Sequence, residues 1–267
     1  MTTSEPVALI TGASAGIGLA LARRYAARGH RLALLARRVD RLEALAGELG
    51  TDRAKAFPCD VAKGSDVEEA VRAARDAFGR IDVVIANAGI AVSGLVERLE
   101  EEAIRRQLET NVFGVVRTVR AALPALKETR GRIGIVGSVN GFLATAAWSP
   151  YVMSKYAVRG FAECLRQELR PYGVSVTHLA PGFVESEIRT LREGQAPVPD
   201  PVPRWIVMPS AKAAAQMERA VTARKRERVI TGHGKAAVFL ERHAPGLVAT
   251  VMNFATARLA KDGAGWG

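Results

Sequence analysis

The chain has 267 residues, of which 48% are hydrophobic and 24% are charged, the composition of a globular protein with ample material for a core. A formal net charge of +11 would suit a nucleic-acid or membrane partner, but the arginines are spread among acidic residues, and only 219–228 forms a dense basic cluster. This distribution argues against nucleic-acid binding. The two cysteines match no metal or disulfide spacing and residues 1–6 do not resemble a secretory signal, so we expect a cytoplasmic protein without a metal.

Short apolar segments alternate with helical segments along the first 180 residues. The predicted strands are 7–11, 31–36, 54–60, 81–86, 132–137 and 174–180. The predicted helices are 19–28, 41–49, 66–78, 100–109, 112–127 and a longer one from Tyr151 to about 170, and Ser65 is the expected N-cap of the third. Strands that alternate with helices of this length require right-handed crossovers and a parallel sheet. The pattern therefore predicts an α/β fold with a doubly wound parallel sheet of the Rossmann type.

The pattern changes after Pro181. Five prolines between residues 195 and 209 exclude a helix or a central strand there, and we interpret 187–209 as a substrate lid loop. A helix over 210–225 and a seventh strand over 228–231 follow. Because no linker divides the chain, we expect one domain over 1–267. The apolar side chains of the loop are Ile188, Leu191, Val198, Val202, Trp205, Ile206, Val207 and Met208.

The last segment, 233–260, predicts a helical C-terminal extension. Leu247, Val251, Phe254 and Leu259 fall roughly on one helical face. The favoured interpretation is packing against the domain or a neighbouring subunit. Contact with a membrane surface and lining of an apolar substrate pocket remain alternatives. The longest uncharged run is too short and too polar to span a bilayer.

A glycine-rich loop follows the first predicted strand and precedes the first helix. Thr11 to Gly18 matches TGxxxGxG, whose glycines allow a tight turn and close approach of a pyrophosphate to the helix N-terminus. Dinucleotide sites read the adenosine ribose just after the second strand, with an acid for NAD or an arginine for NADP. Here that position carries Arg37 and Arg38, and guanidinium groups suit a 2′-phosphate. The sequence therefore predicts NADP(H) in preference to NAD(H).

A second cluster of chemical groups surrounds the start of the long helix. Lys155 follows Tyr151 by four residues, so both lie on one helical face. A nearby ammonium favours the phenolate, and we expect it to lower the pKa of Tyr151 toward the range of efficient proton transfer. Ser138 lies upstream and offers a hydroxyl to hold a substrate. Tyrosine and lysine at this spacing are a weak signal alone, and the rest of the chain makes it a strong one.

Together with Asn87-Ala88-Gly89 and Asn111, these motifs make residues 5–190 resemble the short-chain dehydrogenase/reductase family. The chain departs from the family pattern at Ala86, where an asparagine is frequent, and at Ser186, where threonine is common. Besides Arg37 and Arg38, the resemblance implies cofactor contacts for Gly12, Ser14, Gly16, Ile17, Gly18, Asp60, Val61, Asn87, Ala88, Gly89, Tyr151, Lys155, Pro181, Gly182, Val184 and Ser186.

The resemblance also implies the catalytic roles. Ser138 would hydrogen-bond the substrate oxygen, Tyr151 would donate or remove its proton, and Lys155 would contact the nicotinamide ribose. Asn111 would position a water that connects the lysine to solvent. We therefore expect an NADP(H)-dependent reductase or dehydrogenase that interconverts a small-molecule carbonyl and alcohol, of lipophilic or aromatic character because of the apolar loop. A homodimer or homotetramer is implied as well. The alternative is a non-catalytic NAD(P)-binding protein that senses redox state.

Overall fold

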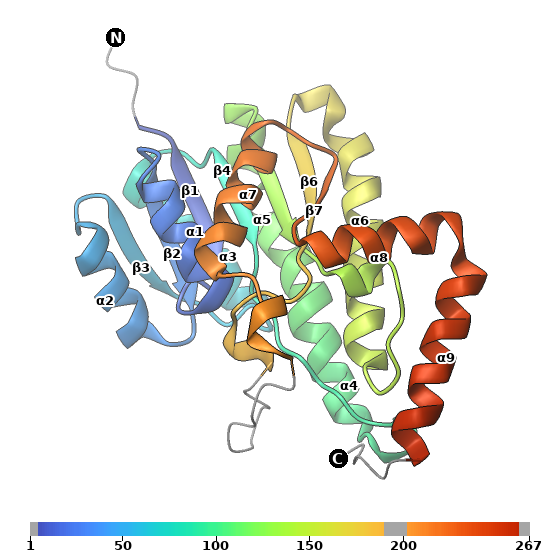
Figure 1. Cartoon of the computed structure of the whole chain (residues 1–267). Helices are drawn as coiled ribbons and strands as arrows, with labels where there is room; N and C mark the ends of the chain where they lie inside the picture. Colours follow the sequence, from blue (N-terminus) through green and yellow to red (C-terminus); the bar gives the residue numbers. More distant parts are fainter. Residues whose placement is uncertain (1–4, 190–201, 262–267) are drawn as a thin grey trace.

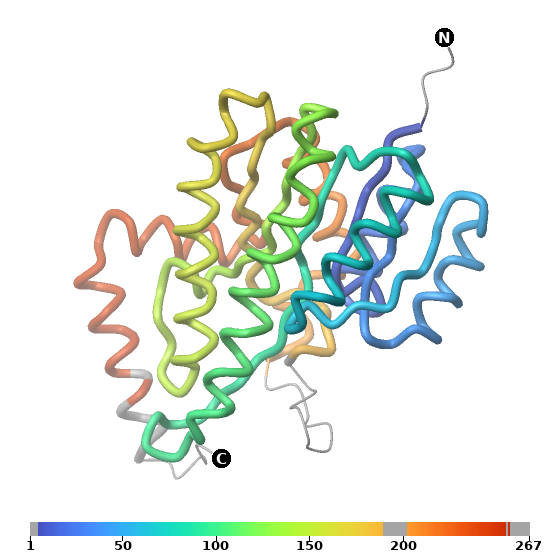
Figure 2. Tube along the Cα trace, turned by 180° about the vertical axis from the view of Figure 1, so that it is seen from behind, coloured from blue at the N-terminus to red at the C-terminus, as the bar shows by residue number. Residues whose placement is uncertain are grey.

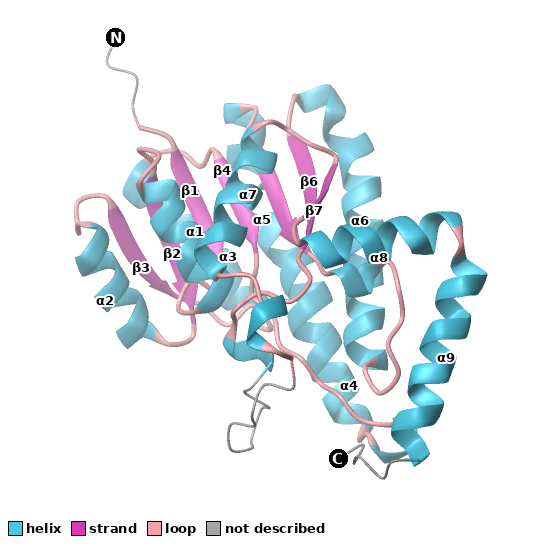
Figure 3. Ribbon diagram, viewed as in Figure 1, coloured by secondary structure: helices cyan, strands magenta, loops and turns pink. Residues whose placement is uncertain are grey.

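The computed structural model describes residues 5–189 and 202–261. Within these residues the seven strands form one parallel sheet in the order β3-β2-β1-β4-β5-β6-β7, and Figure 3 shows them as arrows of common direction. The strands are β1 (Val7–Thr11), β2 (Arg31–Ala36), β3 (Ala54–Pro58), β4 (Val83–Ala86), β5 (Arg132–Val136), β6 (Ser175–Ala180) and β7 (Glu227–Val229). The predicted Rossmann-type fold is confirmed.

Helices cover both faces of the sheet (Figures 1 and 2). One face carries α1 (Gly16–Ala26), α2 (Val39–Leu49) and α7 (Ser210–Thr222). The other carries α3 (Gly64–Phe78), α5 (Gly114–Thr129) and α6 (Ser149–Leu169), with α4 (Glu101–Leu108) against α6. The central strands β1 and β4 are buried along their whole length because successive side chains point to opposite faces and both faces are covered. Ala8 and Ile10 of β1 thus join one core cluster, and Leu9 joins the other.

The strand order reverses direction between β1 and β4. The chain leaves β1 toward β2 on one side and leaves β4 toward β5 on the other, so a crevice is expected at the carboxyl ends of these two strands. The glycine-rich loop follows β1, and Asn87 follows β4. The sheet therefore brings the two motifs to the same edge.

The C-terminal extension is helical, as predicted, but it consists of two helices. They are α8 (Gly232–His243) and α9 (Pro245–Lys261), separated at Ala244, which precedes Pro245 and has non-helical backbone angles. Figure 1 shows α9 beside the main body, and Leu247, Val251 and Phe254 are exposed. In the single chain these three side chains do not pack against the domain, so the part of the prediction that stays is contact with a neighbouring subunit. In the part of the chain that the structure describes, no helix is both long and apolar enough to cross a membrane.

The predicted lid loop is described only at its two ends. Residues 190–201, which include Leu191 and Val198, lie outside the described residues. The ends hold two short 3₁₀ helices, η5 (Glu187–Arg189) and η6 (Arg204–Ile206). Met208 forms a parallel bridge with Val184 after β6, which fixes the second end to the sheet edge. Trp205 is 86% exposed.

Candidate active site

The glycine-rich loop forms a tight turn between β1 and α1. Gly12 and Gly16 have positive φ angles of 67° and 53°, a conformation that L side chains rarely adopt. At position 18 there is no room for a side chain, because a Cβ there would lie 2.2 Å from the carbonyl oxygen of Gly12. The first turn of α1 carries no acidic residue and no side-chain cap, so its amide groups keep their partial positive charge. This loop is built to hold an anionic group close to the backbone.

Thr11 joins the ends of β1 and β4. Its Oγ1 accepts hydrogen bonds from the backbone amides of Asn87 (3.0 Å) and Ala88 (3.1 Å). The Asn87 side chain in turn donates to the carbonyl oxygen of Thr11 at 2.9 Å. A Cβ on Gly12 would lie 2.9 Å from the Cα of Ala88, so the two segments pass in close contact. The structure thus places Asn87 and Ala88 directly against the glycine-rich loop.

Arg38 reaches the same loop from the end of β2. Its Nε and Nη2 lie 3.3 and 3.2 Å from the hydroxyl oxygen of Ser14 and donate hydrogen bonds to it. Its Nη1 donates to Glu187 at 2.8 Å, and Arg41 of α2 donates to the other oxygen of that carboxylate at 2.8 Å. Arg37 is exposed. Of the two predicted arginines, Arg38 contacts the glycine-rich loop. Arg41 lies next to it, which the sequence pattern did not indicate.

Ser138, Tyr151 and Lys155 meet where β5 ends and α6 begins. Ser138 lies close enough to Tyr151 for its hydroxyl to act against the rise in the pKa of the phenol. The Lys155 ammonium lies 5.4 Å from the centroid of the Tyr151 ring and donates to the carbonyl oxygen of Val136 at 3.1 Å. The predicted acid/base group, its cationic neighbour and the second hydroxyl therefore lie together, with Ser138 and Lys155 buried and Tyr151 partly exposed.

The sequence predicts a lowered pKa for Tyr151, whereas in the structure this pKa is raised. Burial raises it, and the hydrogen bond with Ser138 opposes that rise only in part. Burial also lowers the pKa of Lys155, to about 8, because the charged form loses hydration. Desolvation is the main cause of both pKa shifts, and the spacing in the sequence does not reveal it. At neutral pH Tyr151 is a protonated phenol and can donate a proton.

Asn111 lies on the short π-helix η2 (Glu109–Phe113) between α4 and α5. Its amide accepts from the backbone of Ile90 at 2.8 Å and donates to the carbonyl of the same residue at 3.0 Å. It also donates at 3.2 Å to Ser154, whose hydroxyl donates to the carbonyl of Tyr151 at 2.7 Å. Asn111 thereby connects the segment after β4 to the helix that carries Tyr151, and π-helical turns are frequent at functional sites.

The predicted contacts after β3 lie at the same edge of the sheet. Asp60 accepts a hydrogen bond from the backbone amide of Ala62 at 3.1 Å, which closes its turn. The side chain of Val61 is buried, and a Cβ on Gly114 of α5 would come within 2.8 Å of it. The Val61 side chain therefore belongs to the core between β3 and α5.

The segment after β6 packs against both the loop and α8. The carbonyl of Pro181 accepts from the amide of Val139 at 2.9 Å, next to Ser138. A Cβ on Gly182 would lie 2.5 Å from Nε2 of His233, and that nitrogen is 3.1 Å from the amide of Phe183. A Cβ on Gly16 would lie 3.0 Å from the hydroxyl of Ser186, so this segment touches the glycine-rich loop.

Ile17 occupies the first turn of α1. Gly89 lies beside Asn111, since a Cβ on Gly89 would be 3.2 Å from the side-chain oxygen of Asn111. The sequence analysis missed Arg41, Glu187 and His233 as parts of this site. Glu187 lies 146 residues from Arg41, and no local pattern marks such a pair.

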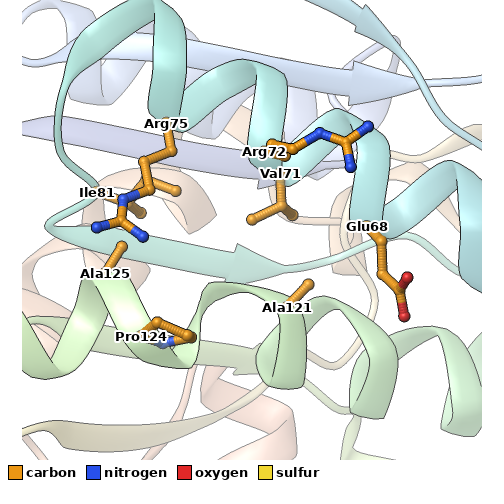
Figure 4. Close-up of a pocket in the computed structure, with 8 residues that line it drawn as sticks. All are labelled: Glu68, Val71, Arg72, Arg75, Ile81, Ala121, Pro124 and Ala125. Atoms are coloured by element: carbon orange, nitrogen blue, oxygen red, sulfur yellow. The ribbon is translucent and has the colours of Figure 1, made fainter.

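A groove of about 240 Å³ lies elsewhere, between α3 and α5 (Figure 4). Its charged residues are Glu68, Arg72 and Arg75, and Arg75 already pairs with Glu128 at 2.7 Å. None of the predicted site residues lines it. Among residues 5–189 and 202–261, no group of three or more His, Cys, Asp or Glu side chains is placed to hold a metal ion.

Residues 6–196 match the family model for short chain dehydrogenases. A 3-oxoacyl-[acyl-carrier-protein] reductase of Bos taurus is 38% identical over 185 residues, which are 69% of this chain and 78% of that protein. An alcohol dehydrogenase of the archaeon Thermococcus sibiricus, solved with 5-hydroxy-NADP, superposes with a TM-score of 0.75 at 34% identity and covers 85% of this chain and 96% of that one. A 3-ketoacyl-(acyl-carrier-protein) reductase of Brucella melitensis, solved with NADH, gives a TM-score of 0.76 at 28% identity and covers 85% and 97%.

Proposed function

The chain belongs to the short-chain dehydrogenase family and is an NAD(P)-dependent oxidoreductase, and we propose that it interconverts a carbonyl and an alcohol with NADP(H), using Tyr151 as the acid/base group. The observation that carries the proposal is the joint placement of Ser138, Tyr151 and Lys155 at the carboxyl edge of a sheet whose glycine-rich loop is shaped for a dinucleotide.

The residues at the loop fit a dinucleotide. The space beside Gly12 and Gly18 is closed to side chains by backbone contacts, and the positive end of α1 faces the loop. When bound, the nicotinamide supplies or accepts the hydride. Pro181 and Gly182 would support the nicotinamide end, Asn87 to Gly89 would pass behind the ribose, and Lys155 would hold the ribose hydroxyls.

The preference for NADP(H) rests on Arg38. Its guanidinium is oriented by the Ser14 hydroxyl, and Arg41 extends the positive charge. A 2′-phosphate carries roughly two negative charges near neutral pH, and a paired guanidinium binds it in a planar, bidentate manner. The NADP analogue bound to the Thermococcus relative is in keeping with this choice.

The remaining residues carry the proton chemistry. In reduction, the substrate oxygen gains negative charge as the carbonyl carbon receives hydride, and Ser138 stabilises that charge by a hydrogen bond. Tyr151, which is protonated at neutral pH, delivers a proton to the same oxygen. The buried ammonium of Lys155 then stabilises the phenolate that forms. Asn111 holds the first turns of α6 in position through its hydrogen bond to Ser154.

We further propose a lipophilic or aromatic substrate and a homo-oligomer. Ile206 and Val207, in the described end of 187–209, lie just before the Met208 bridge and offer partly exposed apolar side chains. Phe113, Met153 and Tyr156 are exposed near the start of α5 and on α6, which suits a contact between copies of the chain. Light scattering after size-exclusion chromatography tests the oligomer.

The test of the function is a turnover assay with NADPH and NADH in parallel across aldehydes, ketones and quinones. We expect turnover with apolar carbonyl compounds and a lower KM for NADPH. Arg38→Ala should weaken NADPH binding about ten- to a hundredfold, because charge-assisted hydrogen bonds are lost, and leave the affinity for NADH nearly unchanged. Saturable NADPH binding without turnover on any compound would favour the redox-sensing alternative instead.

A further inference from the structure

A carboxylate from a distant part of the chain lies between the two arginines of the glycine-rich loop region. Both oxygens of Glu187 are engaged, one by Arg38 and one by Arg41, each at 2.8 Å. Glu187 belongs to η5, and the residue before it, Ser186, touches Gly16 of the loop. An anion of the protein itself thus binds the guanidinium groups that face the adenosine side of the crevice.

This arrangement is suited to exchange. The three side chains keep between 39% and 45% of their surface exposed, and ion pairs of that exposure contribute only about 0–1 kcal/mol each. A phosphate carries roughly twice the charge of a carboxylate and more acceptor oxygens, so it competes effectively for the same donors. Arg38 contacts the Ser14 hydroxyl through Nε and Nη2 and Glu187 through Nη1, so the two contacts use different nitrogens.

We propose that Glu187 is an internal anion that holds Arg38 and Arg41 until a 2′-phosphate displaces it, and that it thereby limits how strongly the protein prefers phosphorylated nucleotides. The proposal rests on the NADP(H) site described above. With an unphosphorylated adenosine, the carboxylate stays on the arginines and no guanidinium is left without a counter-charge. With a phosphorylated one, part of the binding free energy is spent on separating Glu187 from its partners. Glu187 therefore affects nucleotide specificity by competing with the 2′-phosphate, which is also an anion, for the same two arginines.

The experiment measures binding of adenosine 2′,5′-bisphosphate and adenosine 5′-monophosphate by calorimetry, which requires no turnover. Four proteins are compared: the wild type, Glu187→Gln, Glu185→Gln and Arg38→Ala. Glu185 is the matched control, because it lies two residues away, carries the same charge and accepts a hydrogen bond only from the amide of Ser210 among the contacts described. A glutamine at that position keeps the accepting oxygen.

We expect Glu187→Gln to bind the bisphosphate about three- to tenfold more tightly, from the loss of two weak ion pairs, and to bind the monophosphate as the wild type does. Glu185→Gln should leave both constants unchanged. Equal tightening of both nucleotides, tightening by Glu185→Gln as well, or no change for the bisphosphate in Glu187→Gln would overturn the proposal. The two levels fail separately: if the wild type shows no preference for the bisphosphate over the monophosphate, the NADP(H) assignment fails. If the wild type shows that preference and Arg38→Ala keeps it, the 2′-phosphate is bound elsewhere and the role of Glu187 fails alone.

Discussion

Replacing Gly18 by alanine tests how closely the glycine-rich loop is fitted. The added Cβ would lie 2.2 Å from the carbonyl oxygen of Gly12 and 2.6 Å from the side-chain nitrogen of Asn87. A carbon–oxygen contact normally needs about 3.3 Å or more, so the loop must move by about 1 Å. The nearest atom belongs to the backbone of the turn itself, and no rotamer change relieves the contact.

The magnitude follows from two opposing terms. Overpacking of this kind costs about 1–3 kcal/mol, whereas alanine gains up to about 1 kcal/mol over glycine inside a helix. We expect Gly18→Ala to lower the free energy of unfolding by about 1–2 kcal/mol, and to weaken NADPH binding about tenfold because the displaced turn is the one that faces the pyrophosphate. Urea unfolding and fluorescence titration with NADPH measure the two effects.

Gly47 provides the control, because it lies within α2 with no atom within 4 Å of its would-be Cβ. Gly47→Ala should raise the free energy of unfolding by about 0.5–1 kcal/mol and leave NADPH binding unchanged. If Gly18→Ala behaves like Gly47→Ala in both assays, the account of the loop is refuted.

Two further substitutions probe the catalytic groups. Ser138→Ala should lower kcat about 10²- to 10³-fold, the cost of losing one oxyanion donor, without changing the KM for NADPH, and steady-state kinetics will show whether the loss falls on kcat as this role requires. Lys155→Met tests burial of the ammonium: because folding lowers the pKa of Lys155 from 10.5 to about 8, the unfolded chain binds more protons between these values, so the stability of the cofactor-free wild type should rise with pH from 8 to 10.5 relative to Lys155→Met. Urea midpoints that run parallel for both proteins over that range would contradict the burial.

The fold could be predicted because the buried strands are short, mainly apolar runs, and β1 and β5 end directly before a glycine. Val7–Thr11 and Arg31–Ala36 were placed to the residue, since burial on both faces leaves no polar position inside them. Helix starts were harder. Ser65 is a good N-cap by composition, yet α3 begins at Gly64 with Lys63 in the cap position and no side-chain cap hydrogen bond.

The candidate site was predictable where function depends on local spacing, and not where it depends on distant contacts. The glycines of the loop stand at characteristic spacings in the sequence, and so do Tyr151 and Lys155. Glu187 meets its arginines only through the sheet topology. The direction of the Tyr151 pKa likewise depends on burial, which spacing along a helix does not encode.

The most direct test of the central claim is Tyr151→Phe, which removes one hydroxyl and keeps the ring. Single-turnover reduction with saturating NADPH and the best carbonyl compound of the panel separates chemistry from binding. The account predicts a rate lower by about 10²- to 10⁴-fold, the contribution of a positioned general acid, with NADPH affinity retained. A Tyr151→Phe protein that reduces the compound at the wild-type rate would contradict it.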